Sequence, residues 1–170
     1  MNVRPASVDD STAIETVRIQ AWRVAYRHAF PPADLDALPI DPDRWRSRLR
    51  LPPPGWSTFV AEDGGQVIGF ASVGPSRDEE GVGELYAIYV DPESWSTGAG
   101  RALMWAAEER LSAEYESATL WVLEDNPRAR RFYERAGWGA DGGRKAEVRF
   151  GVRAPEVRYR KDFASSRSYS

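Results

Sequence analysis

Two glycines in a short polar segment could bring a ligand close to the main chain. The stretch "YVDPESWSTGAGRALMW", 89–105, passes from an apolar run through a polar loop into a helix-like run that begins near Gly98 and Gly100. Glycine costs roughly 1 kcal/mol relative to alanine inside a helix, so a turn with unusual dihedral angles or a close ligand is expected here. Backbone N–H groups at a helix N-terminus attract anions, and phosphate oxygens could approach these glycines without meeting a Cβ atom. Tight packing of the helix on a sheet is the alternative.

The loop matches neither of two common phosphate-binding patterns. No Gly-Lys-Ser/Thr follows it, which excludes a nucleoside-triphosphate P-loop, and the third glycine of the dinucleotide fingerprint is absent. Ser96 and Thr97 could contact phosphate through their hydroxyls or only cap the helix. Arg101 could meet a phosphate or only solvent.

The composition excludes several kinds of chemistry. The chain has no cysteine and a single histidine, His28, so a disulfide framework, a Cys/His zinc site and a thiol nucleophile are ruled out, and we expect no metal. A net charge of −3 argues against nucleic-acid binding through a basic face. No apolar run approaches the ~20 residues that cross a bilayer, and the N-terminus lacks the apolar core of a secretory signal. We therefore expect a cytoplasmic protein without membrane contact.

The length of 170 residues fits one domain, which we place at 1–162, followed by a flexible polar tail at 163–170. A helix is expected after Ser7, where Ile14, Val17, Ala21 and Val24 recur at helical spacing. If that helix continues, His28 falls on the same apolar stripe, where a structural role is the expectation.

The rest of the chain alternates strands with helices. Asp63-Gly64-Gly65 predicts a hairpin, "GELYAIYV" at 83–90 a buried central strand, and "ATLWVLEDN" a second buried strand. Helices are expected from about Gly98 to Ala113 and from Pro127 to a stop at Gly137, and "AEVRF" and "PEVRYRKDF" would supply closing strands. This order predicts an α/β fold of the α+β kind, with a mixed sheet flanked by helices. Trp105, Trp121 and Phe132 are assigned to the core.

Two segments together resemble a known family. "LWVLEDNPRARRFYERAGW", 120–138, closely resembles the strand–helix signature of the GNAT superfamily, the general-control-related N-acetyltransferases. "WSTGAG", 95–100, is similar to their phosphate loop, [Q/R]-x-x-G-x-[G/A], and both motifs occur in the family's order and at its usual separation. The resemblance covers residues 59–138 well. Trp95 departs from the pattern, so a side-chain hydrogen bond from that position would be lost, while the glycines and backbone amides would still contact the pyrophosphate.

The resemblance implies an acyl-CoA N-acyltransferase fold, with a central, mixed and mostly antiparallel sheet. It also implies direct transfer of an acetyl group from acetyl-CoA to a primary amine of a small molecule or peptide, with no metal and no covalent enzyme intermediate. Ile88, Tyr89 and Val90 would lie nearest the thioester and pantetheine, where a backbone N–H stabilises the oxyanion. Tyr133 would protonate the departing thiolate, and Glu84 is the candidate base. The implied cofactor contacts in and after the loop are Ser96, Thr97, Gly98, Ala99, Gly100, Arg101 and Asn126.

Several alternatives stay open. Tyr133 could simply pack its ring, Glu84 could be an exposed strand-end carboxylate, and Asn126 could merely cap the helix at Pro127. Trp22 and Tyr26 could present aromatic faces to the acceptor amine or belong to the core. A non-catalytic acyl-CoA-binding sensor or regulatory module is the rival function. The "EVRYRKDF" strand could pair with a second subunit, so a homodimer is an open expectation.

Overall fold

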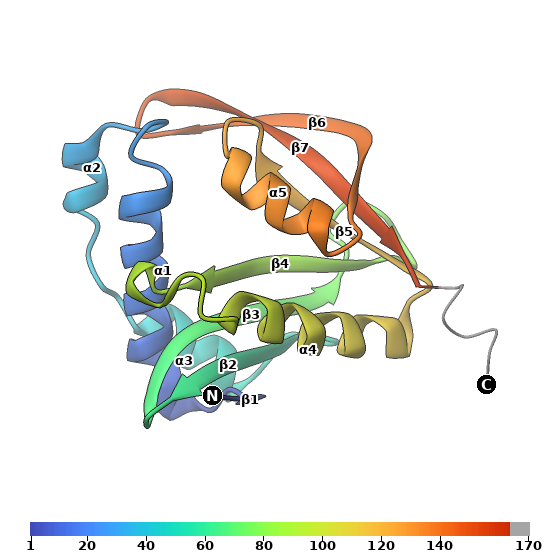
Figure 1. Ribbon diagram of the computed structural model, residues 1–170, viewed down its shortest axis with the longest axis horizontal. Helices are drawn as coiled ribbons and strands as arrows, with labels where there is room; N and C mark the ends of the chain where they lie inside the picture. The colour runs from blue at the N-terminus through green and yellow to red at the C-terminus, as the bar shows by residue number, and fades with distance from the viewer. Residues whose placement is uncertain (164–170) are drawn as a thin grey trace.

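The computed structural model describes residues 1–163 and contains one seven-stranded sheet (Figure 1). Its strands lie in the order β1-β2-β3-β4-β5-β7-β6. Every neighbouring pair is antiparallel except β4 and β5, which run parallel. The prediction of a mixed, mostly antiparallel sheet flanked by helices is confirmed. The strands are β1 (Asn2–Pro5), β2 (Ser57–Asp63), β3 (Gln66–Pro75), β4 (Gly83–Val90), β5 (Ser117–Leu123), β6 (Gly139–Arg149) and β7 (Val152–Asp162).

Helices cover both faces of the sheet. On one face, Ile14, Val17 and Trp45 of the first and third helices pack against Val60 and Phe70. On the other face, apolar residues of the fourth and fifth helices pack against β3, β4 and β5. The helical elements are η1 (Val8–Asp10), α1 (Ser11–Ala25), α2 (Pro32–Asp36), α3 (Asp43–Arg50), η2 (Pro92–Ser94), α4 (Ala99–Glu114) and α5 (Pro127–Arg135).

The pairing of β4 with β5 is short, and this opens the centre of the sheet. Only Gly83 and Glu84 pair with β5, opposite Ala118 and Thr119. Beyond these pairs the two strands diverge, as Figure 1 shows beneath α5. The edge of β4 from residue 85 to 90 is therefore left without a partner strand on the β5 side.

A β-bulge adds to this opening. Ser72 lies opposite Ala87 but Val73 lies opposite Leu85, so Tyr86 is the extra residue on β4. A bulge bends its strand and redirects the side chains beyond it. As a result Leu85, Ile88 and Val90 pack toward α4, whereas Ala87 and Tyr89 pack toward α1 and α3.

Most of the predicted elements are present, and their signals were local. The hairpin turns at Gly64 and Gly65, whose φ angles of +57° and +80° suit glycine. The predicted strand at 83–90 is β4, and the helix expected from about Gly98 is α4.

Other expectations are corrected. Val24, expected on the apolar stripe, is 50% exposed in the last turn of the first helix. That helix ends at Ala25, so His28 lies beyond the stripe, where its ring contacts the Asp125 carbonyl oxygen. Trp105 was assigned to the core, but it is 54% exposed because it lies on the side of α4 opposite the buried residues.

The predicted tail begins one residue too early. Phe163 is buried, its ring lies against Trp138, and its N–H donates to the Glu116 carbonyl oxygen at 2.7 Å. The remainder of that tail, 164–170, lies outside the described residues.

Candidate active site

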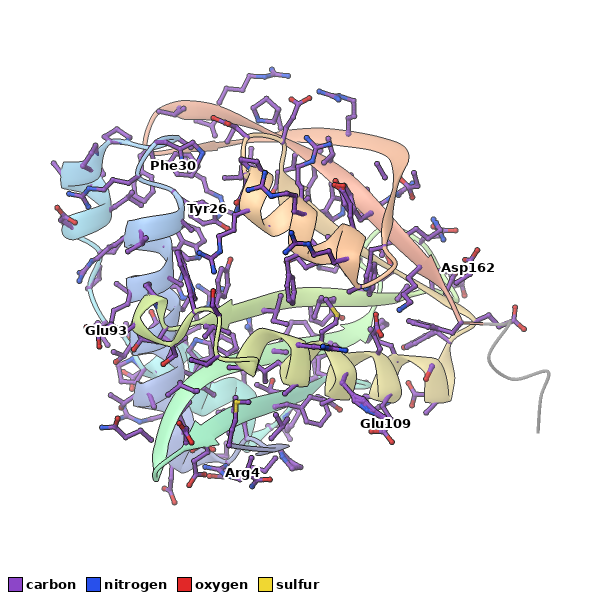
Figure 2. All side chains as sticks on the ribbon, in the orientation of Figure 1. Arg4, Tyr26, Phe30, Glu93, Glu109 and Asp162 are labelled. Carbon is purple, nitrogen blue, oxygen red and sulfur yellow. The ribbon has the colours of Figure 1, made fainter. Side chains whose placement is uncertain are left out.

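A cavity of about 1130 Å³ occupies the gap between β4 and β5. Its lining comes from α4 and α5 on one face of the sheet, from α1 and α3 on the other, and from η2, which contacts α1. The β6–β7 hairpin contributes a further wall, and Tyr26 and Phe30 lie where the end of α1 meets this hairpin (Figure 2). The cavity therefore has one end on the α4 face, at the glycine loop, and another on the α1 face.

The glycine loop has the backbone geometry of an anion site. Gly98 is the N-cap of α4 with φ +94°, and Ser96 also adopts a positive φ of +65°. The first-turn N–H groups of a helix have no partner within it, and here they lie beside the cavity. Ser96, Gly98, Gly100 and Arg101 line the cavity, whereas Ala99 is buried in the core.

Glycine is required at positions 98 and 100 for different structural reasons. Gly98 supplies a conformation that other residues rarely adopt. A Cβ atom on Gly100 would lie 3.3 Å from Cε2 of Phe132, so this glycine lets α5 pack closely on α4. The tight packing expected from the sequence was on the sheet, whereas the close contact of Gly100 is with another helix. Thr97 Oγ1 donates to the Ser94 carbonyl oxygen at 2.6 Å, and Thr97 does not line the cavity.

Trp95 makes a side-chain hydrogen bond within the chain. Its Nε1 donates to the Val90 carbonyl oxygen at 2.9 Å and ties the loop to the end of β4. The guanidinium of Arg128 lies over its ring, 3.6 Å from the centroid, and burial lowers the pKa of Arg128.

Arginines on α5 add positive charge that the sequence reading missed. Arg128, Arg131 and Arg135 line the cavity on the same side as Arg101. Within residues 1–163, none of these four guanidiniums has a carboxylate partner. The sequence feature that could have indicated them is the spacing of the arginines in "PRARRFYERAGW", where Arg128, Arg131 and Arg135 recur on one side of the helix.

Three tyrosines meet in the middle of the cavity. Tyr133 lines it from α5, and in the described part of the chain its hydroxyl has no hydrogen-bond partner. Burial, followed by the nearby Tyr89, raises the pKa of Tyr133, so the hydroxyl stays protonated at neutral pH. The hydroxyls of Tyr26 and Tyr89 lie 3.3 Å apart, and burial raises the pKa of Tyr26 well above its ordinary value.

The structure separates the residues predicted from β4. Ile88 and Val90 pack on the side of α4, while Tyr89 packs on the side of α1. All three line the cavity. Asn126 also lines it, and its side chain accepts a hydrogen bond from the Ala129 N–H at 3.2 Å, which is the capping role.

Glu84 does not face the cavity. Its carboxylate is buried and is held by Arg77, whose Nη2 and Nε donate to Oε2 at 2.5 and 3.1 Å and whose backbone N–H donates to Oε1 at 3.0 Å. A carboxylate with these partners has no free oxygen directed at a substrate. The assignment of Glu84 as the base is therefore not supported by its position, because the ion pair occupies it.

Glu156 on β7 is the carboxylate that the sequence reading missed. It lies opposite Leu123 and Lys145, lines the cavity, and has a buried Oε2 without a hydrogen bond among the described residues. Burial, followed by the charge of Glu147, raises the pKa of Glu156. The charge of Lys145, whose Nζ lies 3.9 Å from Oε2 of Glu156, acts in the opposite direction but does not cancel this rise. The sequence placed it in a closing strand but gave no sign that this strand faces the gap.

The predicted aromatic pair lies at the α1 end of the cavity. Trp22 and Tyr26 both line it, and their rings meet edge to face with centroids 4.9 Å apart. The Trp22 Nε1 is buried without a partner in the described residues, and the guanidinium of Arg149 lies 4.9 Å from its ring centroid. Trp121, assigned to the core from the sequence, instead lines the cavity, where Lys145 Nζ lies 4.4 Å from its ring centroid.

Over residues 1–163, no group of three or more histidine, cysteine or acidic side chains is placed to hold a metal ion. In the same range, no helix has both the length and the apolar character needed to cross a membrane.

Comparisons with known proteins agree on one family. Residues 19–138 match the model of the acetyltransferase (GNAT) family. The chain is 41% identical over 133 residues to the uncharacterized N-acetyltransferase YuaI of Bacillus subtilis, covering 75% of this chain and 74% of that one. It is 31% identical over 165 residues to the probable N-acetyltransferase Rv2775 of Mycobacterium tuberculosis, covering 94% and 92%.

A solved structure shows the same fold at low identity. The PaiA N-acetyltransferase from Thermoplasma acidophilum, crystallised in complex with coenzyme A, superposes with a TM-score of 0.74 at 17% identity, covering 95% of this chain and 98% of that one. The chain belongs to the acetyltransferase (GNAT) family and is an acyltransferase of that family.

Proposed function

We propose that this protein transfers an acetyl group from acetyl-CoA directly to a primary amine of a small molecule or peptide. One observation supports the proposal most strongly. A single cavity runs through the gap between β4 and β5, from a loop surrounded by unpaired arginines, past Tyr133, to a wall of aromatic and charged side chains. Such a passage lets two substrates enter from opposite faces and meet in the middle.

The residues on the α4 face fit coenzyme A. The first-turn N–H groups of α4, together with Arg101 and Arg128, suit the phosphate groups. The unpaired edge of β4 offers main-chain N–H and C=O groups that suit the amides of a pantetheine arm. When bound, acetyl-CoA supplies the activated acyl group as a thioester.

Two side chains are proposed to move protons. Tyr133 is protonated and its hydroxyl has no partner in the described chain, so it can donate to a departing thiolate. Glu156 replaces Glu84 as the proposed base, because it lines the cavity and its raised pKa brings it nearer to neutrality. A backbone N–H on the free edge of β4 can stabilise negative charge that develops on the acetyl oxygen.

The rival function is a non-catalytic acyl-CoA-binding module. Such a module needs the loop and the arginines but no protonated Tyr133 and no half-buried Glu156, so the presence of both favours the enzyme. The test is thiol release from acetyl-CoA by the purified chain with a panel of primary amines. Amine-dependent release supports the transferase. Stoichiometric binding of acetyl-CoA without release above the amine-free rate would support the binding module.

A further inference from the structure

A wall of arginine and aromatic side chains closes the cavity on the α3 side. The guanidinium of Arg48 lies over two tryptophan rings, 5.2 Å from the centroid of Trp45 and 4.7 Å from that of Trp56. Trp56 in turn lies against Tyr86, with centroids 4.2 Å apart, and Arg77 lies over Tyr86 at 5.2 Å. All five residues line the cavity.

The charges around this wall are unequally compensated. Arg18 is paired with Glu15 and Arg77 with Glu84. On the facing hairpin, the cations Lys145 and Arg149 are paired with Glu147 and Glu156. Across the described residues, Arg48 and its neighbour Arg44 have no carboxylate partner, although both line the cavity. The positive charge of Arg48 is thus left without a carboxylate nearby, whereas the charge of Arg44 also acts on Glu15 and lowers its pKa.

Arg48 is held in a way that prepares it for an anion. Burial, followed by the charges of Arg44 and Arg77, lowers the pKa of Arg48, which means that the charged guanidinium is destabilised by its surroundings. An unpaired charge in such a place is costly to the fold, and an incoming anion would relieve that cost. Two tryptophan rings lie beside the guanidinium, and no hydrogen bond within the described residues occupies its N–H groups, which can therefore make a bidentate contact with an anion.

We propose that the acceptor is an amine that also carries an anionic oxygen group, a carboxylate or a phosphate, and that Arg48 and Arg44 bind this group. The inference rests on the proposed transferase function and names its substrate class. Glu156 lies on the opposite wall, where it would face the amino end of the same molecule. Arg77 lies close enough to Glu156 to lower its pKa, so the two walls belong to one region of the cavity.

The test uses pairs of amines with and without the anionic group, and kcat/KM is referred to the concentration of unprotonated amine because the anionic group also raises the pKa of the amino group. L-Leucine is compared with L-leucinamide for the carboxylate, and phosphoethanolamine with ethanolamine for the phosphate. Each compound is assayed twice: for kcat/KM in thiol release, and for the shift in melting temperature that it causes with and without coenzyme A. The variants are Arg48→Met, Arg44→Met and, as a control, Arg50→Met, because Arg50 is an exposed arginine of the same helix that does not line the cavity.

For the wild-type chain, the anionic member of at least one pair should exceed its neutral partner in kcat/KM by about tenfold or more. Arg48→Met should reduce this ratio by about ten- to a hundredfold, the usual effect of losing a hydrogen bond to a charged group. Arg44→Met should lower the ratio in the same direction, and Arg50→Met should leave it unchanged. The pair that shows the preference identifies the anionic group.

Two results would overturn the inference. One is equal or better use of the neutral amines by the wild-type chain, and the other is a preference that Arg48→Met and Arg44→Met leave intact. Either would leave the transferase function standing. A chain that binds no acetyl-CoA would contradict the transferase function instead. In that case the melting temperatures decide the inference: a shift that anionic amines cause in the wild type but not in Arg48→Met supports it, and no such shift overturns it.

Discussion

Replacing Tyr133 by phenylalanine removes one hydroxyl that the fold does not use. No group in the described part of the chain hydrogen-bonds this hydroxyl, and the ring keeps its contacts with Phe132 and Tyr159 in the variant. Loss of a general acid reduces turnover by about 10²–10⁴-fold. Because no hydrogen bond is lost, the free energy of unfolding should change by less than about 0.5 kcal/mol. Tyr133→Phe should therefore lower kcat strongly while stability and acetyl-CoA affinity stay nearly constant.

A second tyrosine supplies a control with the opposite result. The hydroxyl of buried Tyr159 accepts a hydrogen bond from Nε of Arg130 at 2.9 Å and does not line the cavity. Its removal leaves Nε of Arg130 without its acceptor and should cost about 1–3 kcal/mol. For a domain of this size, each kcal/mol lowers Tm by about 2–4 °C. Tyr159→Phe should thus be less stable but should keep its turnover per folded molecule.

The assay measures kcat by thiol release, Tm by thermal unfolding and the Kd of acetyl-CoA for both variants. Unchanged kcat in Tyr133→Phe would refute the acid assignment. A fall in kcat accompanied by an equal loss of cofactor affinity would also refute it, because the hydroxyl would then act in binding. If Tyr159→Phe lost turnover as severely, the effect would belong to the packing of α5 and not to proton transfer.

Two further predictions test the carboxylates. Glu156→Gln should lower kcat/KM by about 10²-fold or more and abolish the acidic limb of the pH profile of kcat/KM. Glu84→Gln should alter stability but keep turnover per folded molecule, because Glu84 is paired with Arg77. The reverse result would restore Glu84 as the base. Asp10 is buried, and its hydrogen bonds to Arg4 lower the pKa of its carboxyl despite burial. Asp10→Asn should cost about 1–3 kcal/mol at pH 7, a difference that shrinks as the pH falls below about 4, since a lowered pKa stabilises the fold only while the carboxylate is ionised. Denaturant unfolding of the wild type and Asp10→Asn at pH 7 and below about pH 4 checks this prediction. A difference in the free energy of unfolding that stays the same at the two pH values would contradict it.

The architecture could be predicted because its signals lie within short segments. Gly98 and Pro127 mark the starts of α4 and α5, and Gly137 marks the end of the latter. The glycine pair at 64–65 marks the hairpin, and the apolar run at 83–90 is bounded as a strand. Each of these depends on the conformational preference of one or two residues, which the sequence carries directly.

The acceptor side of the site could not be predicted in the same way. Glu156 faces the gap only because β7 pairs with β5 while β5 diverges from β4, and these contacts join residues far apart in the chain. Arg77 lies in the connection between β3 and β4 and donates back to Glu84 on β4, a pairing that leaves no local pattern. In the sequence Arg48 is one more charged residue on an arginine-rich helix, and only the folded positions of Trp45 and Trp56 show that its guanidinium lies beside two rings.

Calorimetric titration of the purified chain with acetyl-CoA tests the central claim most directly, with desulfo-CoA and adenosine diphosphate as reference ligands. Our account predicts saturable, one-to-one binding in which the pantetheine arm contributes, so adenosine diphosphate should bind more weakly than either coenzyme. This follows from a loop that holds phosphates and a free edge of β4 that holds the arm. No binding at millimolar acetyl-CoA would contradict the account, and the assignments of Tyr133 and Glu156 would then lose their basis.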